Sequence, residues 1–479
     1  MFLGLLLILV PVVGGLVCFL WSSDRTRPNL IPAFAAPHLL LTLAAVARAS
    51  DEQRGWLVLD PPGRIVLLLV SSLFAVSAPY AVAYLRRMQP RSNRVFCACL
   101  LVFLGMMTFI TWSHHLGLMW VAIEATTLSS APLIYFNRNA RSLEATWKYL
   151  MVGSVGIALA LLGSLFLGYS ATLSGRVPSL LFDDLNRNAA AFSKAWLHPA
   201  FVLLLVGYGT KMGLAPMHTW KPDAYGEAPG LVGGLLAGGM TSCAFLAILR
   251  VFHVLVAAGE TAFASRILVY LGLFSMAFAG VFMVRQKDFK RMLAYSSVEH
   301  MGILVLGLGL GLTGVFGALL HMVNNGLIKG VMFLSAGNIH RAYGSKSTDD
   351  VTGAWRRVPW SGALFLVGFV AVTGSPPFGP FVSEFTILNA AFAQHRYVAA
   401  AAFLLFLLVV FMGMGTTVLA LVVGEAPPRT AAAARFPDTK FTVLPLLVLL
   451  GASLVMGIAM PGAVSDLLHK AAHYVGDLP

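Results

Sequence analysis

The stretch GYGTKMGLAPMHTWKPDAYGEAP, residues 207–229, interrupts a long apolar segment with a proline and places a lysine beside the interruption. Pro216 offers no amide hydrogen and clashes with the preceding turn, so a helix kinks or opens at this point. Lys211 lies just before the break, where carbonyl groups freed from the helix can stabilise its charge. Non-helical backbone persists at membrane depth only where protein buries it or where it lines a wet cavity. The stretch therefore predicts a broken membrane helix with a lysine beside a polar path.

A second break, VTGSPPFGPFVSEF, spans residues 372–385. Three prolines open the helix there and Glu384 follows them, so the two breaks carry charges of opposite sign. Interrupted helices at corresponding positions of two halves are typical of inverted-repeat transporters. The broken segments are the seventh and twelfth expected spans, and an odd offset inverts one half relative to the other. We therefore predict two inverted five-helix repeats, residues 95–256 and 257–424, each with one broken helix.

The composition of the whole chain indicates the same class of protein. Of its 479 residues, 58% are hydrophobic and 11% are charged, whereas soluble domains average about 25% charged residues. Mean hydropathy is +0.81. Apolar stretches of about 20 residues can span a bilayer, and they predict an all-α polytopic membrane protein with about 14 transmembrane helices. We expect these at about 1–22, 29–48, 64–85, 95–112, 115–136, 145–170, 197–226, 229–256, 264–284, 292–312, 315–339, 360–393, 397–424 and 441–461.

The two ends of the sequence complete this organisation. Residues 1–94 form an expected N-terminal three-helix segment, and residues 425–479 form a C-terminal loop and a final helix. The first span has no basic residue before it and no small-residue cleavage signal after it. We therefore expect a retained membrane helix and not a removed signal peptide.

The net charge of +13 follows a pattern along the loops. Basic residues are about twice as frequent on the loops of one side as on those of the other, and the positive-inside rule places the richer side in the cytoplasm. We predict a multi-pass protein of the bacterial inner membrane with both termini on the periplasmic side. The positive charge then orients the chain in its lipid bilayer, and no nucleic-acid partner is needed to explain it.

Four charged residues lie well inside apolar spans: Glu124, Lys211, Lys329 and Glu384. A charge at bilayer depth costs about 2.5–3.5 kcal/mol, and it persists when it pairs with another charge or faces a hydrated cavity. Spread along one chain, the four indicate a route for protons or ions. The alternative is one or two structural ion pairs that lock the bundle.

Further charges near the expected inner face admit two interpretations each. Lys148 follows Glu144 by four residues, which makes an ion pair on a helix surface, either alone or as an access group for protons. Lys290 marks either the channel mouth or a positive-inside anchor. Asp223 is either a gate at this mouth or a solvated loop charge.

The sequence offers no recognisable redox or metal chemistry. The four cysteines lie in apolar segments, where small buried side chains explain them best. No glycine-rich phosphate loop, HExxH or GxSxG is present, and the loops are short. We therefore expect no cofactor, no metal site and no soluble catalytic domain.

Four long motifs in a fixed order carry a resemblance to a known family. They are WVAIEATTL at 120–128, the lysine helix followed by the family's HxWLPDA segment, here His218-Thr-Trp-Lys-Pro-Asp-Ala224, QKDFKRMLAYSS at 286–297, and HMVNNGLIKGVMFLSAG at 321–337. Over about residues 64–425 the chain resembles the antiporter-like subunits of respiratory complex I, the Mrp-type cation/proton antiporters, and the membrane arms of energy-converting hydrogenases and formate hydrogenlyase. Glu299-His300, in AYSSVEHMG, is most similar to the hydrogenase branch.

The resemblance implies proton translocation along a hydrated axis across the middle of the membrane. The path would run through Glu124, Lys211, His321, Lys329 and Glu384, with His218, Glu299 and His300 beside it. A carboxylate beside a lysine favours the charged lysine, so separating Glu124 from Lys211 would release a proton. Energy would come from other membrane-arm subunits and a peripheral oxidoreductase module, because the chain carries no recognisable redox centre.

Two positions depart from the family pattern. Relatives carry a lysine or histidine in the eighth helix, whereas residues 230–240 contain no titratable side chain and Ala237 lies near the expected position; Asn325 replaces a second histidine. Water must fill the gap, or the path is interrupted. Three alternatives stay open: a subunit of a Na⁺/H⁺ antiporter, a subunit of an inorganic-carbon uptake complex, and a non-pumping membrane scaffold, which the missing base favours.

Overall fold

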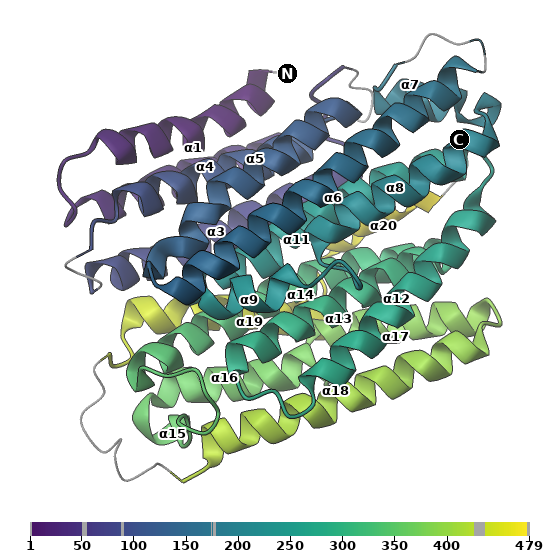
Figure 1. Cartoon of the computed structure of the whole chain (residues 1–479). Helices are drawn as coiled ribbons and strands as arrows, with labels where there is room; N and C mark the ends of the chain where they lie inside the picture. The colour runs from purple at the N-terminus through teal and green to yellow at the C-terminus, as the bar shows by residue number, and fades with distance from the viewer. Residues whose placement is uncertain are drawn as a thin grey trace.

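The computed structural model describes residues 2–49, 55–87, 91–173, 175, 179–425 and 436–476. Over these residues the regular structure is helical, apart from three isolated two-residue bridges between loops. The long helices lie side by side along one common direction, as Figure 1 shows. The described residues therefore form the all-helical membrane fold that the hydropathy predicts.

The first part of the chain combines long helices with short connecting ones. These are α1 (Phe2–Leu20), α2 (Leu30–Arg48), α3 (Pro61–Arg86), α4 (Arg94–Trp112), α5 (Leu116–Ile134), α6 (Ala140–Thr172), α7 (Phe182–Asn188), α8 (Lys194–Met212), α9 (Trp220–Glu227), α10 (Gly230–Leu235) and α11 (Thr241–Ala257). Single 3-10 turns occupy Arg27–Asn29, Tyr135–Asn137 and Ala189–Ala191. A π-helical turn, Leu236–Met240, joins α10 to α11 and makes them one continuous span.

The second part has the same character. Its helices are α12 (Thr261–Met283), α13 (Phe289–Leu308), α14 (Gly311–Tyr343), α15 (Ala354–Arg357), α16 (Pro359–Val372), α17 (Gly379–Ala393), α18 (Tyr397–Val423), α19 (Lys440–Ile458) and α20 (Gly462–Gly476). In Figure 1, α1 begins and α20 ends toward the same, right-hand end of the bundle. The short helices α7 and α20 were not expected from the sequence, because neither is long enough to give a membrane-span signal.

Among the described residues, eleven helices are long and apolar enough to cross a membrane, and each coincides with an expected span. The expected spans at 197–226 and 360–393 are split, the first into α8 and α9 and the second into α16 and α17. The expected span at 292–312 is α13, whose polar residues include Lys290 and Glu299. Length and apolarity alone therefore identify eleven spans, and the other three are interrupted or more polar.

Both predicted interruptions are present in the structure. α8 ends at Met212 and is followed by Gly213, whose φ of +86° favours glycine, and the chain then turns into the short helix α9. A Cβ at Gly213 would also lie within 2.8 Å of three atoms of the Lys221 side chain, so this position needs a glycine for two reasons. The second interruption separates α16 from α17, as the prolines of 372–385 predict.

Close helix contacts hold each half together. A Cβ on Gly207 of α8 would lie 2.6 Å from the carbonyl oxygen of Gly156 on α6, so only glycine permits this approach. Gly272 of α12 and Gly302 of α13 face each other in the same manner. Lipid chains are as apolar as leucine, so such close packing, more than burial of apolar surface, stabilises membrane helices against one another.

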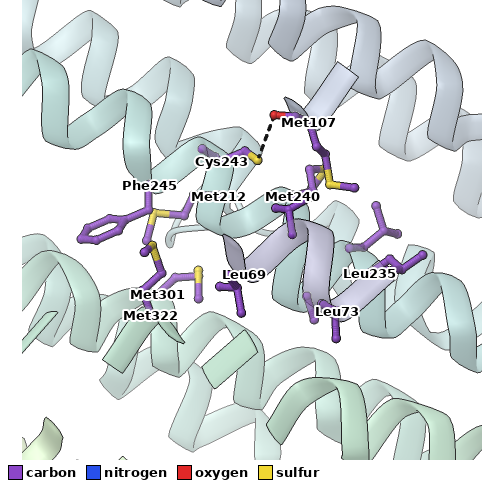
Figure 2. Packing of buried hydrophobic residues seen from close by; sticks show 14 of the residues in the cluster. Leu69, Leu73, Met107, Met212, Leu235, Met240, Cys243, Phe245, Met301 and Met322 are labelled. Carbon is purple, nitrogen blue, oxygen red and sulfur yellow. Dashed lines mark hydrogen bonds between the residues drawn. The ribbon is translucent and has the colours of Figure 1, made fainter. Parts of the chain in front are cut away.

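The span formed by α10 and α11 lies at the centre of the bundle, because 94% of its most apolar window is buried. Its neighbours are apolar: Figure 2 shows Met212, Met301 and Met322 grouped beside Phe245. Met107 and Met240 are grouped near Cys243 in the same view. Flexible methionine side chains fill irregular spaces in such a core.

The loops separate into two groups at opposite ends of the bundle. One end carries the loops that are richer in basic residues and is called the basic end below. There Arg87 donates to the Pro437 carbonyl and Asn137 donates to the Glu227 carbonyl. At the other end, the backbone amide of Phe182 donates to the carbonyl of His114. Loops that were expected on the same side of the membrane therefore contact one another.

Candidate functional site

Lys211 is buried in the first half of the bundle, where three helices meet. Its Nζ donates to Thr127 Oγ1 on α5 at 2.7 Å and to the Tyr149 hydroxyl on α6 at 2.8 Å. It also lies 4.7 Å from the centre of the Tyr149 ring, within range of a cation–π interaction. The last turn of α8 carries this lysine, and the negative end of the helix dipole stabilises a cation there.

Glu124 is coupled to Lys211 through a hydroxyl group. Thr127 Oγ1 donates to Glu124 Oε2 at 3.1 Å while it accepts from Lys211. The two charges interact, but the described structure has no direct ion pair between them. The expected pair is therefore indirect: Lys211, Thr127 and Glu124 form a continuous line of donors and acceptors along which a proton can pass.

The second half of the bundle contains a comparable arrangement around Lys329 of α14. Its Nζ donates to Ser296 Oγ of α13 at 2.6 Å, and its charge interacts with that of Glu299 on the same helix. Each buried lysine thus binds a hydroxyl on a neighbouring helix and lies near a carboxylate. The sequence placed Glu299 in a secondary role, whereas its charge interacts with both Lys329 and Glu384.

His321 and Glu384 lie together beyond this lysine. His300 Nδ1 and His321 Nε2 are 2.9 Å apart, and His321 Nδ1 lies 2.9 Å from Ser383 Oγ. A carboxylate oxygen of Glu384 lies within 4.8 Å of a ring nitrogen of each histidine. Helices α13, α14 and α17 thus bring together three residues that the sequence assigned to one path.

Lys221 is a functional candidate that the sequence analysis missed. It is fully buried in α9, and its Nζ donates to the carbonyls of Met212 at 2.7 Å and Ser297 at 3.4 Å. Its charge interacts with those of Lys329 and His300. A signal was present, because Lys221 occupies the leucine position of the family's HxWLPDA segment.

Aromatic rings connect the surroundings of Lys211 with those of Lys221. The Tyr149 ring lies 5.0 Å from that of Trp220, which lies 5.9 Å from that of Tyr225. Tyr149 binds Lys211, and Lys221 lies 5.7 Å from the centre of the Tyr225 ring. Lys221 also bonds Met212, next to Lys211, and Ser297, next to the Ser296 that binds Lys329, so it lies between the two lysines.

Apolar side chains fill the region where relatives carry a base in the eighth helix. Ala237 is fully buried within the π-helical turn, beside the buried Leu235 and Met240. A Cβ at the neighbouring Gly238 would touch Leu73. The π-helical turn around Ala237 thus carries no titratable side chain, whereas α9 carries the buried Lys221.

Buried polar atoms without a hydrogen-bond partner among the described residues gather along the route. They include Tyr225 OH, Ser297 Oγ, His300 Nε2, both amide atoms of Asn325, Oε1 of Glu384 and Nδ1 of His218. Leaving such a group unpaired costs about 1–3 kcal/mol, and ordered water commonly satisfies buried polar groups. These atoms give this part of the bundle a polar lining, and Asn325 contributes an amide that does not titrate.

The remaining sequence-predicted residue of the broken segment, His218, lies beside this route in an aromatic environment. Its ring centre is 4.7 Å from that of Phe278 and 6.4 Å from that of Tyr295. It is buried, and its other contacts do not join it to a lysine or carboxylate through a hydrogen bond in the described structure.

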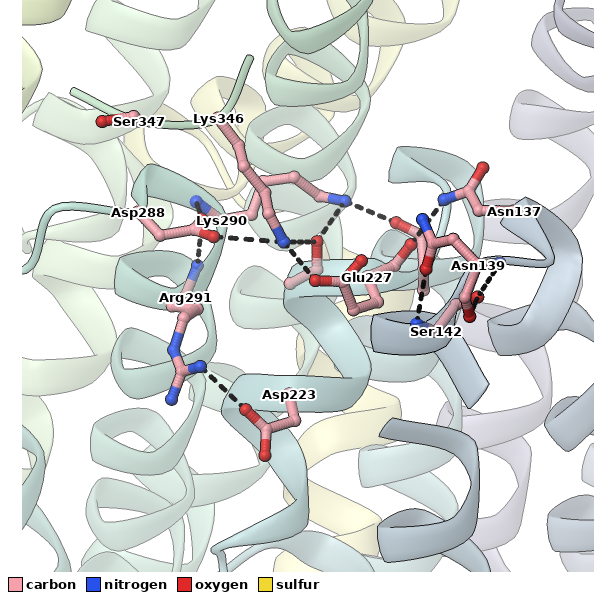
Figure 3. Close-up of polar contacts among 12 residues, drawn as sticks. Asn137, Asn139, Ser142, Asp223, Glu227, Asp288, Lys290, Arg291, Lys346 and Ser347 are labelled. Carbon is pink, nitrogen blue, oxygen red and sulfur yellow. Dashed lines mark hydrogen bonds and ion pairs between the residues drawn. The ribbon is translucent and has the colours of Figure 1, made fainter. Parts of the chain in front are cut away.

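At the basic end, Asp223 connects two halves of the bundle. Lys148 forms the expected pair with Glu144 at 2.6 Å and a second pair with Asp223 at 2.9 Å. Asp223 also pairs with Arg291 at 2.8 Å, as Figure 3 shows. The side chain of Lys148 is 47% exposed in the chain alone.

Lys290 holds the end of α9 in place beside this mouth. Its Nζ donates to the carbonyls of Gly226 at 2.9 Å and Ala228 at 2.5 Å. Lys346 pairs with Glu227 at 2.5 Å in the same cluster, which Figure 3 also shows. Both lysines complement the negative C-terminal end of α9. Lys290 is therefore a positioning residue for the broken segment as well as a basic residue at the mouth.

The whole fold is shared with solved membrane-complex subunits. It superimposes on a chain of the membrane-bound sulfane sulfur reductase, an archaeal respiratory complex, with a TM-score of 0.88, 20% identity and coverage of 99% of this chain and 98% of that chain. For respiratory complex I of Thermus thermophilus the TM-score is 0.84, with 23% identity and coverage of 98% and 99%. The chain therefore shares its fold with subunits of these membrane complexes.

Sequence comparison identifies the family. The family described as NADH:quinone oxidoreductase/Mrp antiporter, transmembrane, matches residues 113–412. The chain is 34% identical over 403 residues to the hydrogenase-4 component F homolog of Methylacidiphilum infernorum, which covers 82% of this chain and 84% of that protein. It is 30% identical over 411 residues to NADH-quinone oxidoreductase subunit N of Desulforudis audaxviator, with 81% and 79% covered. The chain belongs to the NADH:quinone oxidoreductase/Mrp antiporter family.

Proposed function

We propose that this chain is the proton-translocating, antiporter-like subunit of a multisubunit, redox-driven membrane complex. The observation that carries the proposal is the pair of buried lysines, Lys211 and Lys329, each bonded to a hydroxyl and coupled to a carboxylate. Groups of this kind persist at membrane depth mainly where they move or balance charge. Similarity to the hydrogenase-4 component F homolog favours a hydrogenase-type partner module.

The geometry supports a stepwise path through the first half. A proton that reaches Lys148 at the basic end passes by way of water toward Lys211. When Lys211 is charged, Thr127 and Tyr149 accept its hydrogen bonds and Glu124 balances its charge. Weakening the coupling to Glu124 destabilises the ammonium form, so Lys211 then releases its proton.

Lys221 and Lys329 continue the path into the second half. Like charges on Lys221 and Lys329 repel each other, so a proton arriving on one favours release from the other. Glu299 offsets the charge of Lys329, and the cluster of His300, His321 and Glu384 forms the far end. The turn around Ala237 supplies no titratable side chain, so the proposed route runs by way of Lys221.

The finer topology belongs to the same proposal. Eleven spans, the two split segments and α13 together give fourteen crossings, and the two breaks support inverted repeats at 95–256 and 257–424 with flanking segments 1–94 and 425–479. The separation of the loops to two ends of the bundle supports a topology with both termini on one side of the membrane. The distribution of basic residues assigns that side to the periplasm.

A partner subunit is needed beside α5. Glu124 is only half-buried in the isolated chain, and Val121 and Leu128 on the same face are 46% and 63% exposed. A carboxylate facing lipid at this depth would be costly. A neighbouring membrane subunit covering this face would shield it, and its movement would adjust the coupling between Glu124 and Lys211.

Proton uptake by vesicles that contain the purified complex tests the function. Redox turnover of the intact complex should acidify or alkalinise the vesicle interior, and Lys211→Ala should remove this signal while all subunits still assemble. Unchanged proton flux in an assembled Lys211→Ala complex would instead support the scaffold alternative. Arg187→Ala, on the exposed surface of α7, serves as the matched control.

A further inference from the structure

Three ligand-type side chains from three helices meet in the second half of the bundle. A ring nitrogen of His300 on α13, a ring nitrogen of His321 on α14 and a carboxylate oxygen of Glu384 on α17 lie within 4.8 Å of one another. We propose that they form a binding site for a divalent transition-metal ion, with Zn²⁺ the best fit, and that a bound ion blocks the proton route. The blocking rests on the proposed function, whereas the binding does not.

The spacing suits a tetrahedral ion. His300 Nδ1 lies 2.9 Å from His321 Nε2. Two nitrogens that are each about 2.0–2.1 Å from a tetrahedral zinc lie about 3.3 Å apart. The two nitrogens therefore need to separate by only a few tenths of an ångström, and the Glu384 oxygen, which lies within 4.8 Å of them, needs to move closer to reach the same spacing. With Glu384 as the third ligand, a water molecule takes the fourth position, as in other zinc sites with three protein ligands.

Hydrogen bonds already hold His321 in the tautomer that binds metal. Ser383 Oγ donates to the Pro380 carbonyl at 2.9 Å, which uses its single proton. The same oxygen lies 2.9 Å from His321 Nδ1 and so accepts a hydrogen bond from it. The lone pair of His321 Nε2 therefore points toward His300. Outer hydrogen bonds of this type commonly orient metal-bound histidines.

His300 can supply its own lone pair by moving one proton between its nitrogens. Without metal, Nδ1 donates to His321, and Nε2 has no hydrogen-bond partner among the described residues. Nε2 lies 4.0 Å from Glu299 Oε2. When the ion takes Nδ1, the proton moves to Nε2 and faces this carboxylate. Binding thus converts an unpaired buried nitrogen into a donor with an acceptor close by.

Glu384 supplies the negative ligand and lies against the second break. Its Oε1 is buried and lacks a hydrogen-bond partner among the described residues, so coordination would satisfy it. The carboxylate packs against Gly374 in the second break, where Pro376 and Pro377 are exposed on the surface of the chain.

The ligand set selects the ion. Imidazole nitrogens suit zinc and other late transition metals, whereas magnesium and calcium prefer oxygen ligands. The sequence predicted no metal site, and the three ligands lie far apart in the chain without the close spacing of familiar zinc motifs. Only the packing of α13, α14 and α17 brings them together.

Cobalt titration of the purified, chelator-treated complex tests the binding. Co²⁺ replaces zinc in tetrahedral sites and then absorbs strongly in the visible range. We expect saturable binding of one ion per chain, displacement by Zn²⁺, and affinity at least about tenfold weaker in Glu384→Gln and in His321→Asn. Ser383→Ala keeps all three ligands and should weaken binding by a smaller factor, which covers the case in which a ligand variant fails to assemble.

The matched control is His38→Gln, because His38 is also buried but binds Ser71 and Thr108 away from the cluster. It should leave the cobalt bands unchanged. Absence of saturable binding, or bands that persist in the assembled ligand variants, would overturn the site. Full proton flux with zinc bound would overturn the blocking. A complex that moves no protons before zinc is added would contradict the proposed function alone, and the cobalt titration would still decide the site.

Discussion

The ammonium group of Lys221 donates a 2.7 Å hydrogen bond to the backbone carbonyl of Met212, the residue next to Lys211. Lys221 thereby ties the start of α9 to the end of α8, and its charge also interacts with that of Lys329. This places a titratable group between the two halves, where Ala237 provides none.

Lys221→Leu installs the residue of the family's motif and should reduce proton flux by at least about tenfold, because the path then lacks a group between Lys211 and Lys329. Vesicle proton uptake and subunit composition are the measurements. Ala237→Lys in the same variant should restore part of the flux by supplying a base in the eighth helix. Lys287→Leu, which removes an exposed lysine paired with Asp349, is the control. Unimpaired flux in Lys221→Leu would contradict this role.

Thr127→Val should also lower proton flux by about tenfold or more. Valine has nearly the same shape but loses the hydroxyl that joins Lys211 to Glu124, and hydrogen bonds to charged groups contribute about 1.5–3 kcal/mol each. Thr127→Ser should retain most of the flux. Thr126→Val is the matched control, because the hydroxyl of Thr126 bonds the carbonyl of Ile123 in its own helix. Equal flux in the two valine variants would show that proton transfer does not depend on the Thr127 hydroxyl.

Gly213→Ala should impair both stability and flux, because an added Cβ meets a strained backbone conformation and displaces the Lys221 side chain. The left-handed conformation alone costs an alanine about 1–2 kcal/mol. Gly259→Ala measures this backbone cost alone, since Gly259 has a φ of +72° and open space around its Cβ position. Thermal unfolding should shift in both variants, whereas flux should fall only in Gly213→Ala. A loss of flux in Gly259→Ala would remove the distinction.

Asp60→Asn should destabilise the chain by about 3–5 kcal/mol, the usual cost of removing one partner from a buried ion pair. Asp60 accepts from Arg250 through both oxygens, at 2.8 and 2.9 Å, and both side chains are buried. Its loss leaves the guanidinium charge of Arg250 without a counter-ion. Thermal unfolding of the purified complex measures the effect, and the exposed pair of Arg187 and Asp184 provides a control in Asp184→Asn.

Acid should weaken the same contact. Burial raises the pKa of Asp60, but the charge and hydrogen bonds of Arg250 outweigh it, so the pKa lies below the usual value for aspartate. The stabilisation is therefore present above the unfolded pKa of about 3.9 and is lost as pH falls through the lower folded value. The difference in thermal stability between the wild type and Asp60→Asn should be constant above about pH 5 and shrink below about pH 4. A difference that grows on acidification would contradict this assignment.

The sequence was sufficient for the features that depend on local chemistry. Pro216 predicted the first break, and Pro376, Pro377 and Pro380 predicted the second. Long apolar stretches predicted the eleven confirmed spans. Charges in apolar surroundings identified Lys211 and Lys329, and the structure buries both. The four-residue spacing also predicted the pair of Glu144 and Lys148.

Features that depend on packing between distant helices were not accessible in the same way. The position of Thr127 in the sequence does not indicate that it bridges two charged residues. That role depends on α8, which brings Lys211 into contact with it. The cluster of His300, His321 and Glu384 requires three helices to converge. Lys221 differs, because it replaces an apolar residue of the family motif, and this replacement can be seen in the sequence alone.

Lys211 and Lys221 flank the same short connector, which begins at Gly213. Neither lysine can therefore be displaced without altering the position of the other. A rotation at this connector would increase the distance from one lysine to its neighbouring proton-accepting group and decrease the distance from the other lysine to its own. The break in the helix would then take part in proton transfer and also couple that transfer to the movement of α8 relative to α9.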